Sequence, residues 1–146
     1  MTRSIGHISI PVWNMQDTLD FYEGILGCPH GRLSETKADF NFFGQHLVVH
    51  VASERMQKEA AIERPFNERL ARHFGVIVRM AEYKRIVKLL EGRDITYVIE
   101  PTIENEGTDK EEGLVFFLDP AMNSVEIKGF DNPQYLSPIL EWEAQA

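Results

Sequence analysis

Three short apolar segments of this sequence each carry a side chain that can bind a metal ion. His7 opens Gly-His-Ile-Ser-Ile-Pro-Val, His73 opens His-Phe-Gly-Val-Ile-Val, and Glu126 lies within Ser-Val-Glu-Ile-Lys. Imidazole and carboxylate groups are unusual in apolar strands, because burying a polar group costs free energy unless it finds a partner. Two histidines and one carboxylate are also a ligand set that holds a divalent metal with open coordination positions. The pattern predicts a metal centre, provided that the three segments meet in the fold.

A fourth histidine, His50, lies in the apolar run Leu-Val-Val-His-Val. It could complete the metal shell as a ligand, or act on the substrate as an acid–base group beside the metal. Glu126 is the second candidate for proton transfer. By strand alternation, Asn41 and Lys128 fall on the same faces as these groups, so we expect them to line the substrate pocket. A lone strand histidine is more often a hydrogen-bonded structural residue, and this reading applies to each position taken singly.

The elements that must position these residues repeat once along the chain. Each half has the order strand, helix, strand, strand, strand, so the sequence predicts two such modules at about 4–52 and 73–130, joined by a linker at 53–72 and followed by a tail at 131–146. Two modules related by a pseudo-twofold axis would make His7 equivalent to His73, and would make the last strands, which carry His50 and Glu126, equivalent to each other. The expected elements are strands 5–12, 31–35, 39–43 and 46–52 with a helix at 14–26, then strands 73–79, 95–99, 113–118 and 124–129 with a helix at 82–91, and a loop at 104–112.

Composition limits the class of protein. The 146 residues suit one domain with a real core, and the net charge of −8 disfavours nucleic acid as a partner. Apolar runs are too short for a membrane helix, which needs roughly 20 residues. The only cysteine, Cys28, is expected to be a packing residue in a protein of the reducing cytoplasm. His30 and His46 are expected at the surface near turns.

The chain resembles the vicinal oxygen chelate superfamily of glyoxalases, bleomycin-resistance proteins and extradiol dioxygenases. The resemblance covers most of residues 4–130. It is carried by Gly-His-Ile-Ser-Ile-Pro-Val with Asp-Phe-Tyr-Glu-Gly-Ile-Leu-Gly, by Asp-Phe-Asn-Phe-Phe-Gly, by His-Phe-Gly-Val, and by Phe-Phe-Leu-Asp-Pro running on to Glu126. It implies an α+β fold in which two βαβββ modules form an open, U-shaped mixed β-barrel with helices on the outside. Within this superfamily, the chain is most similar to a bacterial branch of short proteins described as extradiol-dioxygenase-like.

The resemblance implies a divalent metal held by His7, His73 and Glu126, with His50 as a fourth ligand or a nearby acid–base group. Fe(II) is the favoured ion, and Mn, Ni, Co or Zn fit the same ligands. The expected protein is a homodimeric, metal-dependent dioxygenase acting on a small molecule through two adjacent oxygens. A glyoxalase-type lyase or isomerase is the alternative, because the ring-cleaving signature has Tyr in place of Phe116 and a small residue in place of Met122. The third possible function is that of a resistance protein that binds a drug without catalysis.

Overall fold

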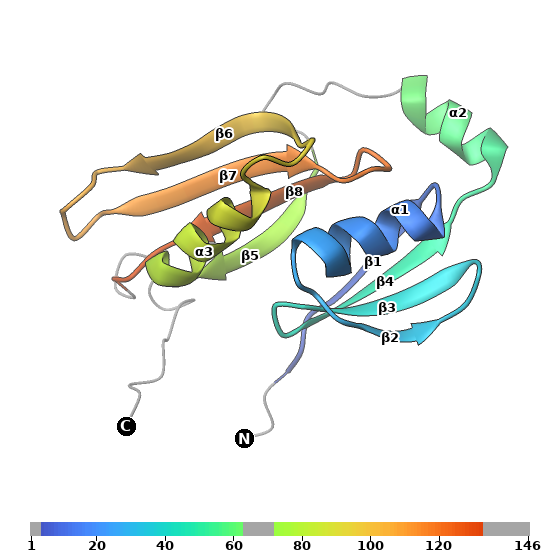
Figure 1. Cartoon of the computed structure of the whole chain (residues 1–146), viewed down its shortest axis with the longest axis horizontal. Coiled ribbons are helices and arrows are strands. Elements are labelled where there is room, and N and C mark those ends of the chain that lie inside the picture. The colour runs from blue at the N-terminus through green and yellow to red at the C-terminus, as the bar shows by residue number, and fades with distance from the viewer. Residues whose placement is uncertain (1–3, 63–71, 133–146) are drawn as a thin grey trace.

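The computed structural model describes residues 4–62 and 72–132. The described chain forms two four-stranded sheets with the strand orders β1-β4-β3-β2 and β5-β8-β7-β6 (Figure 1). In each sheet the first and last strands of the module pair in parallel, and the other pairs are antiparallel. This confirms the predicted α+β fold of two βαβββ modules, and the two sheets form no closed barrel.

The element bounds follow the prediction closely. In the first module they are β1 (His7–Val12), α1 (Met15–Leu19) continued by a π-helical segment η1 (Asp20–Ile25), β2 (His30–Leu33), β3 (Lys37–Phe42) and β4 (Gln45–Val51). In the second they are β5 (Phe74–Val78), α3 (Met80–Leu90), β6 (Thr96–Glu104), β7 (Glu112–Leu118) and β8 (Ser124–Gly129).

Two segments differ from expectation. The charged linker at 53–72 predicts one helical turn at most, whereas the structure contains a nine-residue helix there, α2 (Glu54–Ile62). Its start is capped, because the Met56 amide donates to Ser53 Oγ at 3.3 Å. Strand β6 continues past Pro101 to Glu104, because the pairing register with β7 shifts in that stretch and tolerates a residue without an N–H. The tail lies outside the described residues from 133 onward.

The residues at the two ends of the first helix explain why its position could be predicted from local sequence. Asn14 Oδ1 accepts a hydrogen bond from the Asp17 amide at 2.9 Å, as expected of an N-cap. The helix ends at Gly27, which has a φ of +71°, a conformation that favours glycine. Between them, the π-helical turn places Phe21 and Tyr22 in the core.

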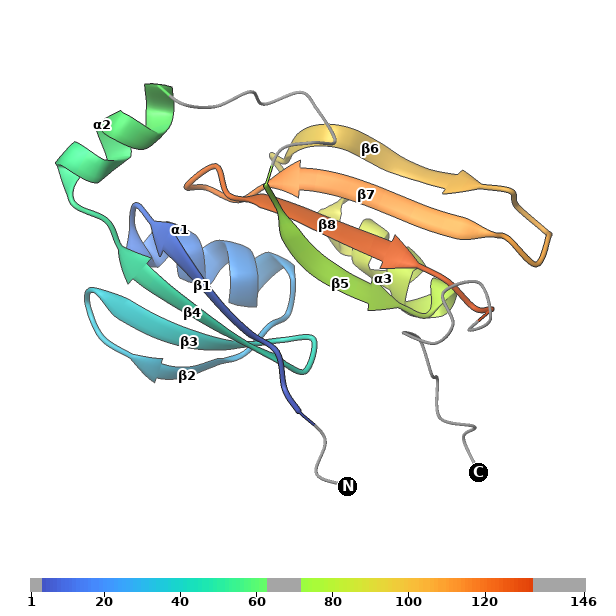
Figure 2. The same ribbon diagram turned by 180° about the vertical axis from the view of Figure 1, so that it is seen from behind.

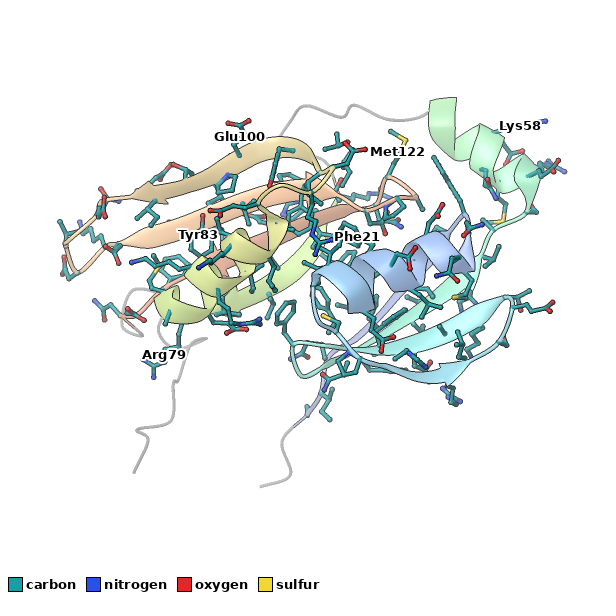
Figure 3. All side chains as sticks on the ribbon, in the orientation of Figure 1. Phe21, Lys58, Arg79, Tyr83, Glu100 and Met122 are labelled. Atoms are coloured by element: carbon teal, nitrogen blue, oxygen red, sulfur yellow. The ribbon has the colours of Figure 1, made fainter. Side chains whose placement is uncertain are left out.

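The hydrophobic core runs through both modules. Phe21 projects from η1 toward the second sheet (Figure 3), where its ring lies 6.0 Å from that of Phe117. The Tyr22 hydroxyl donates to Asp119 Oδ2 at 2.7 Å, and both residues are buried. Burial raises the pKa of the Asp119 carboxyl, and it raises the pKa of Tyr22 well above its usual value. These contacts hold the modules side by side.

Helices cover one face of each sheet and leave the other face bare. Figure 1 shows α1 and α3 in front of the sheets, and Figure 2 shows the two helix-free faces from behind. Strand β1, at the edge of the first sheet, buries Ile10 and Val12 on its helix side, while His7, Ser9 and Pro11 are exposed. The predicted ligands therefore lie on the faces that the helices do not cover.

Candidate metal centre

Two of the predicted ligands meet on the second sheet. His73 immediately precedes β5 and Glu126 lies in the middle of β8, and Nε2 of His73 is 2.6 Å from Oε2 of Glu126. Their side chains are 31% and 17% exposed, so both donors are reachable from solvent. The Phe116 ring lies 4.8 Å from the His73 ring and supplies an apolar wall. The result is a carboxylate–imidazole pair at the rim of a partly apolar site.

This pair lines a pocket on the helix-free face of the second sheet. Its walls come from β5 and β8, and the lining includes His73, Gly75, Ile77, Glu126 and Lys128. Lys128 Nζ lies 2.8 Å from Glu112 Oε1, so its charge is balanced within the site. Lys128 therefore lines this pocket.

Gly75 has a different role from the one its size suggests. By strand alternation Gly75 shares a face with His73, and its small size suggests room for a ligand there. In the structure, a Cβ at Gly75 would collide with the backbone carbonyl of Glu126. Glycine is therefore required because β5 approaches β8 very closely, and this approach sets the spacing of His73 and Glu126.

His7 meets another histidine. Its Nδ1 is 2.8 Å from Nδ1 of His46, and the two rings stack with centroids 4.9 Å apart. On the other side of His46, Nε2 lies 3.4 Å from Asp39 Oδ1, and Arg32 Nε lies 2.5 Å from Asp39 Oδ2. The hydrogen bond from Arg32 holds the pKa of the Asp39 carboxyl below its usual value. His46, expected as a surface residue near a turn, is thus a half-buried strand residue in a polar chain.

The strand register places His50 away from His7 within one copy. His7 is in register with His46, whereas His50 is in register with Pro11. Strands advance roughly 3.3 Å per residue, so His50 lies roughly 13 Å along β4 from His46. His50 is exposed and is not beside His7 within one copy.

The strand registers of the two modules identify the residue of the first module that is equivalent to Glu126. Two residues after His73, Gly75 is in register with Glu126. Two residues after His7, Ser9 is in register with Val48. Val48 is therefore the equivalent of Glu126, and His50 is the equivalent of Lys128. The first module offers no carboxylate at this point.

Asn41 lies on the same face as His46, but its amide serves a turn. Its Oδ1 accepts a hydrogen bond from the Gly44 amide at 2.8 Å. Phe43 and Gly44 both have positive φ, at 49° and 86°, so the turn between β3 and β4 needs this support. The side-chain oxygen of Asn41 is thus used to stabilise this turn.

Within one copy, the three predicted ligands do not converge. No group of three or more metal-binding side chains is present in residues 4–62 and 72–132. Strands β1 and β5 run in opposite directions (Figures 1 and 2), which puts their N-terminal ends at opposite ends of the paired sheets. His7 and His73 lie at those ends. The donor set nevertheless suits a divalent first-row metal, with two imidazole nitrogens and a carboxylate on exposed sheet faces.

The sequence did not predict that His46 and Asp39 lie beside His7. Both share a face with His7, yet the sequence signal for them is weak. Their proximity depends on the register of β1 against β4 and of β3 against β4, which no local pattern specifies.

The chain belongs to the glyoxalase/bleomycin resistance protein/dioxygenase superfamily, whose profile matches residues 4–127. Members of this superfamily include metal-dependent glyoxalases, dioxygenases and fosfomycin-resistance proteins, bind divalent metals and small molecules, and are often dimeric. Among curated proteins, none matches this chain.

Solved structures share the fold. A glyoxalase/bleomycin resistance protein/dioxygenase from Alicyclobacillus acidocaldarius is 25% identical, with a TM-score of 0.72 over 92% of this chain and 96% of that one. The fosfomycin resistance protein FosX from Mesorhizobium loti is 13% identical, with a TM-score of 0.64 over 94% and 100%. A glyoxalase/dioxygenase from Nostoc punctiforme is 19% identical, with a TM-score of 0.62 over 88% and 92%. In the part of the chain that is described, no helix has the length and apolarity to span a membrane.

Proposed function

We propose that this protein is a metal-dependent enzyme that acts on a small molecule chelated through two adjacent oxygens, of the non-haem Fe(II) dioxygenase type. The observation that supports the proposal best is the pair of His73 and Glu126, with Nε2 and Oε2 2.6 Å apart in a pocket on a helix-free sheet face. Two donors of the expected kinds, from strands that are distant in sequence, meet in a concave site. Such a site is the usual starting point for assigning a metalloenzyme.

The third ligand in this proposal comes from a second copy of the chain. His7 and the pair of His73 and Glu126 lie on different sheets and at opposite ends of one copy, so a centre that contains all three needs two copies. In a twofold dimer each copy gives His7 to one centre and His73 with Glu126 to the other, which makes two equivalent centres. The expected homodimer thus becomes a requirement of the active site.

Three protein ligands leave room for the substrate. Because Val48 stands where the symmetry would place a second carboxylate, the first module adds only His7. The remaining coordination positions stay open, which is the arrangement of Fe(II) oxygenases. Bound Fe(II) would supply Lewis acidity and redox chemistry with dioxygen, and Mn, Ni, Co or Zn are the other candidate ions.

The chain's own residues would orient the substrate and move protons. Glu126 is the proposed base nearest to the metal. His50 lies too far along β4 to bind the same ion as His7 of its own sheet. Its proposed role is a proton relay to the part of the substrate that lies away from the metal. Lys128 and Asn41 are the proposed polar lining. A buried, unpaired Cys28 agrees with a cytoplasmic protein.

A glyoxalase-type isomerisation is the second candidate function, and Phe116 favours it. This ring contacts His73 at the position where the ring-cleaving signature carries a tyrosine. The site therefore lacks a phenol to hydrogen-bond a substrate oxygen there. In this reaction Glu126 would transfer the proton, and a divalent metal held by the same residues would supply polarisation of a carbonyl.

The test is reconstitution of the purified protein with Fe(II) under anaerobic conditions, followed by oxygen-uptake assays with a series of catechols. Stoichiometric metal and oxygen uptake would support the dioxygenase. Metal binding without uptake, but with turnover of an α-ketoaldehyde–thiol adduct, would assign the glyoxalase-type reaction. Absence of metal binding, with tight binding of a glycopeptide drug of the bleomycin type, would replace both by a sequestering function.

A further inference from the structure

We propose that His46 and Asp39 are positioning residues for His7. Asp39 contacts His46, and His46 is hydrogen-bonded to His7. This polar chain holds the His7 imidazole as the Nδ1–H tautomer, with the Nε2 lone pair directed away from the chain and free to bind an ion. The inference depends on the proposed function in one respect, which is that His7 binds the metal.

The chain starts at a buried carboxylate oxygen. Asp39 Oδ1 is inaccessible to solvent and makes no hydrogen bond of normal geometry among the described residues. The other oxygen, Oδ2, is held by Arg32 Nε at 2.5 Å, which fixes the carboxylate in place. His46 Nε2 faces the buried oxygen at 3.4 Å. An imidazole lone pair pointing at a carboxylate would be repelled, so this nitrogen of His46 carries the proton.

The proton on Nε2 decides what the other nitrogen of His46 can do. A neutral imidazole has one donor and one acceptor nitrogen, so Nδ1 of His46 accepts. The atom 2.8 Å from it is Nδ1 of His7, which must therefore donate. The same rule then leaves Nε2 of His7 as the acceptor, because the tautomer of a histidine is set by the hydrogen bond of its other nitrogen.

Ring stacking adds orientation to the choice of tautomer. The imidazoles of His7 and His46 are inclined by 25° with centroids 4.9 Å apart, which restricts rotation of the His7 ring about its side-chain bonds. His7 opens β1 and is exposed, so without such contacts its side chain would sample several rotamers. Metal-binding histidines generally donate their second ring N–H to a partner, and that partner affects metal affinity.

A comparison of the two modules shows why only His7 needs this chain. In the second module the equivalents of His46 and Asp39 are Ser124 and Phe116. There, His73 is oriented directly by the Glu126 carboxylate and packed against Phe116. In the first module, Val48 replaces that carboxylate, and the carboxylate of Asp39 acts on His7 through His46.

The direct test is the tautomeric state of His7 in the metal-free protein. Long-range 1H–15N correlation spectra at a pH where imidazoles are neutral distinguish protonated from unprotonated ring nitrogens. We expect His7 to be protonated at Nδ1 in the wild-type protein and to lose this preference in His46→Phe. His46→Asn, which keeps a hydrogen-bond acceptor near the position of Nδ1, should restore it. A wild-type His7 protonated at Nε2 would overturn the inference.

The second readout is the affinity for Co2+, measured by competition with a chelator at a fixed pH. His46→Phe and Asp39→Leu should each bind Co2+ at least about tenfold more weakly than the wild type, the lower end of the usual effect of such partners. His30→Phe, which removes an exposed histidine paired with Glu23, is the matched control and should bind like the wild type. Affinities in both chain variants equal to that of the control would refute the positioning role.

The two measurements separate this inference from the proposed function. If the wild-type protein binds no Co2+, the metal-dependent function fails, and the spectra of His7 still decide whether the chain sets its tautomer. Circular dichroism and thermal unfolding of each variant show whether the first sheet remains folded. Loss of the tautomer preference in a folded His46→Phe protein would support the inference.

Discussion

Nε2 of His73 lies 2.6 Å from Oε2 of Glu126, across two strands that pair in parallel. The pairing register places Glu126 opposite Gly75, two residues after His73, so both side chains reach the same face. Because Gly75 has no side chain, the backbones approach closely enough for the two groups to meet. The geometry of the candidate centre is thus a consequence of one glycine in an edge strand of the sheet.

The carboxylate of Glu126 should dominate metal affinity. Glu126→Gln removes the charge and keeps the shape, so we expect the Co2+ affinity to fall by about a hundredfold or more. Loss of a residue that only hydrogen-bonds to a metal ligand lowers metal affinity by about 10–100-fold, and loss of a charged ligand should cost at least as much. Titration with Co2+ against a chelator measures the change. Glu104→Gln, an exposed position on β6, is the control. Unchanged affinity in Glu126→Gln would exclude this residue as a ligand.

Replacing Gly75 should damage both stability and the site. A Cβ there would collide with the Glu126 carbonyl, so Gly75→Ala must push β5 from β8 and cost about 3 kcal/mol or more of unfolding free energy, at the upper end of overpacking effects. Urea denaturation measures this. Gly31→Ala, whose Cβ would make an ordinary 3.8 Å contact with Asp39, should cost less than about 1 kcal/mol. Equal losses in both variants would contradict the close-approach argument.

The hydrogen bonds of Asp119 should be important for holding the two modules together. Its Oδ1 accepts from the amides of Ala121 and Asn123, and its Oδ2 accepts from Tyr22 and from the side chain of Asn123. Asp119→Ala leaves several buried donors unsatisfied, so we expect a loss of about 2–3 kcal/mol in the free energy of unfolding.

Tyr22→Phe, which removes one bond and keeps the ring, should cost about 1 kcal/mol. Chemical denaturation of both variants supplies the values. A larger loss in Tyr22→Phe than in Asp119→Ala would show that the carboxylate is not the centre of this network.

Asp119 should also impose a pH dependence on stability. Burial raises its pKa in the folded protein above that of the unfolded chain, so the folded state binds the proton more readily. The unfolding free energy contributed by this group therefore falls as pH rises from the unfolded pKa to the folded pKa, and is constant above both. Compared with Asp119→Asn, the wild type should gain relative stability between pH 7 and pH 4. A relative loss on acidification in urea titrations would reverse the sign and refute the assignment.

Cys28 should be inert in the folded protein. Burial raises the pKa of its thiol to about 11 from an ordinary value of 9.0. At pH 8 the thiolate population is then lower by about a hundredfold, and the thiolate is the reactive form. We expect alkylation by iodoacetamide at pH 8 to be at least about a hundredfold slower than in urea-unfolded protein, as followed by mass spectrometry. Equal rates would mean that the thiol is accessible in the folded state.

The sequence alone determined the fold and placed the candidate ligands His7 and Glu126 on strands. Strand alternation put His7 and Glu126 opposite the apolar residues that face the helices, and Ser124–Gly129 was predicted to the residue. These features depend on neighbours within a few positions of the chain, so local periodicity and turn residues suffice to read them. The repeated order of elements then indicated two modules.

Only the tertiary structure decided which side chains meet. Whether His46 or His50 lies beside His7 depends on the register of β1 against β4, and the helix and two strands that separate them hide this register from any local pattern. The same is true of Val48, which stands where Glu126 has its equivalent. The opposite directions of β1 and β5 place His7 and His73 at different ends of the molecule (Figure 1), and these directions depend on how the two modules pack against each other. Residue types specify which metals a site can bind, and the packing of whole modules decides which residues form it.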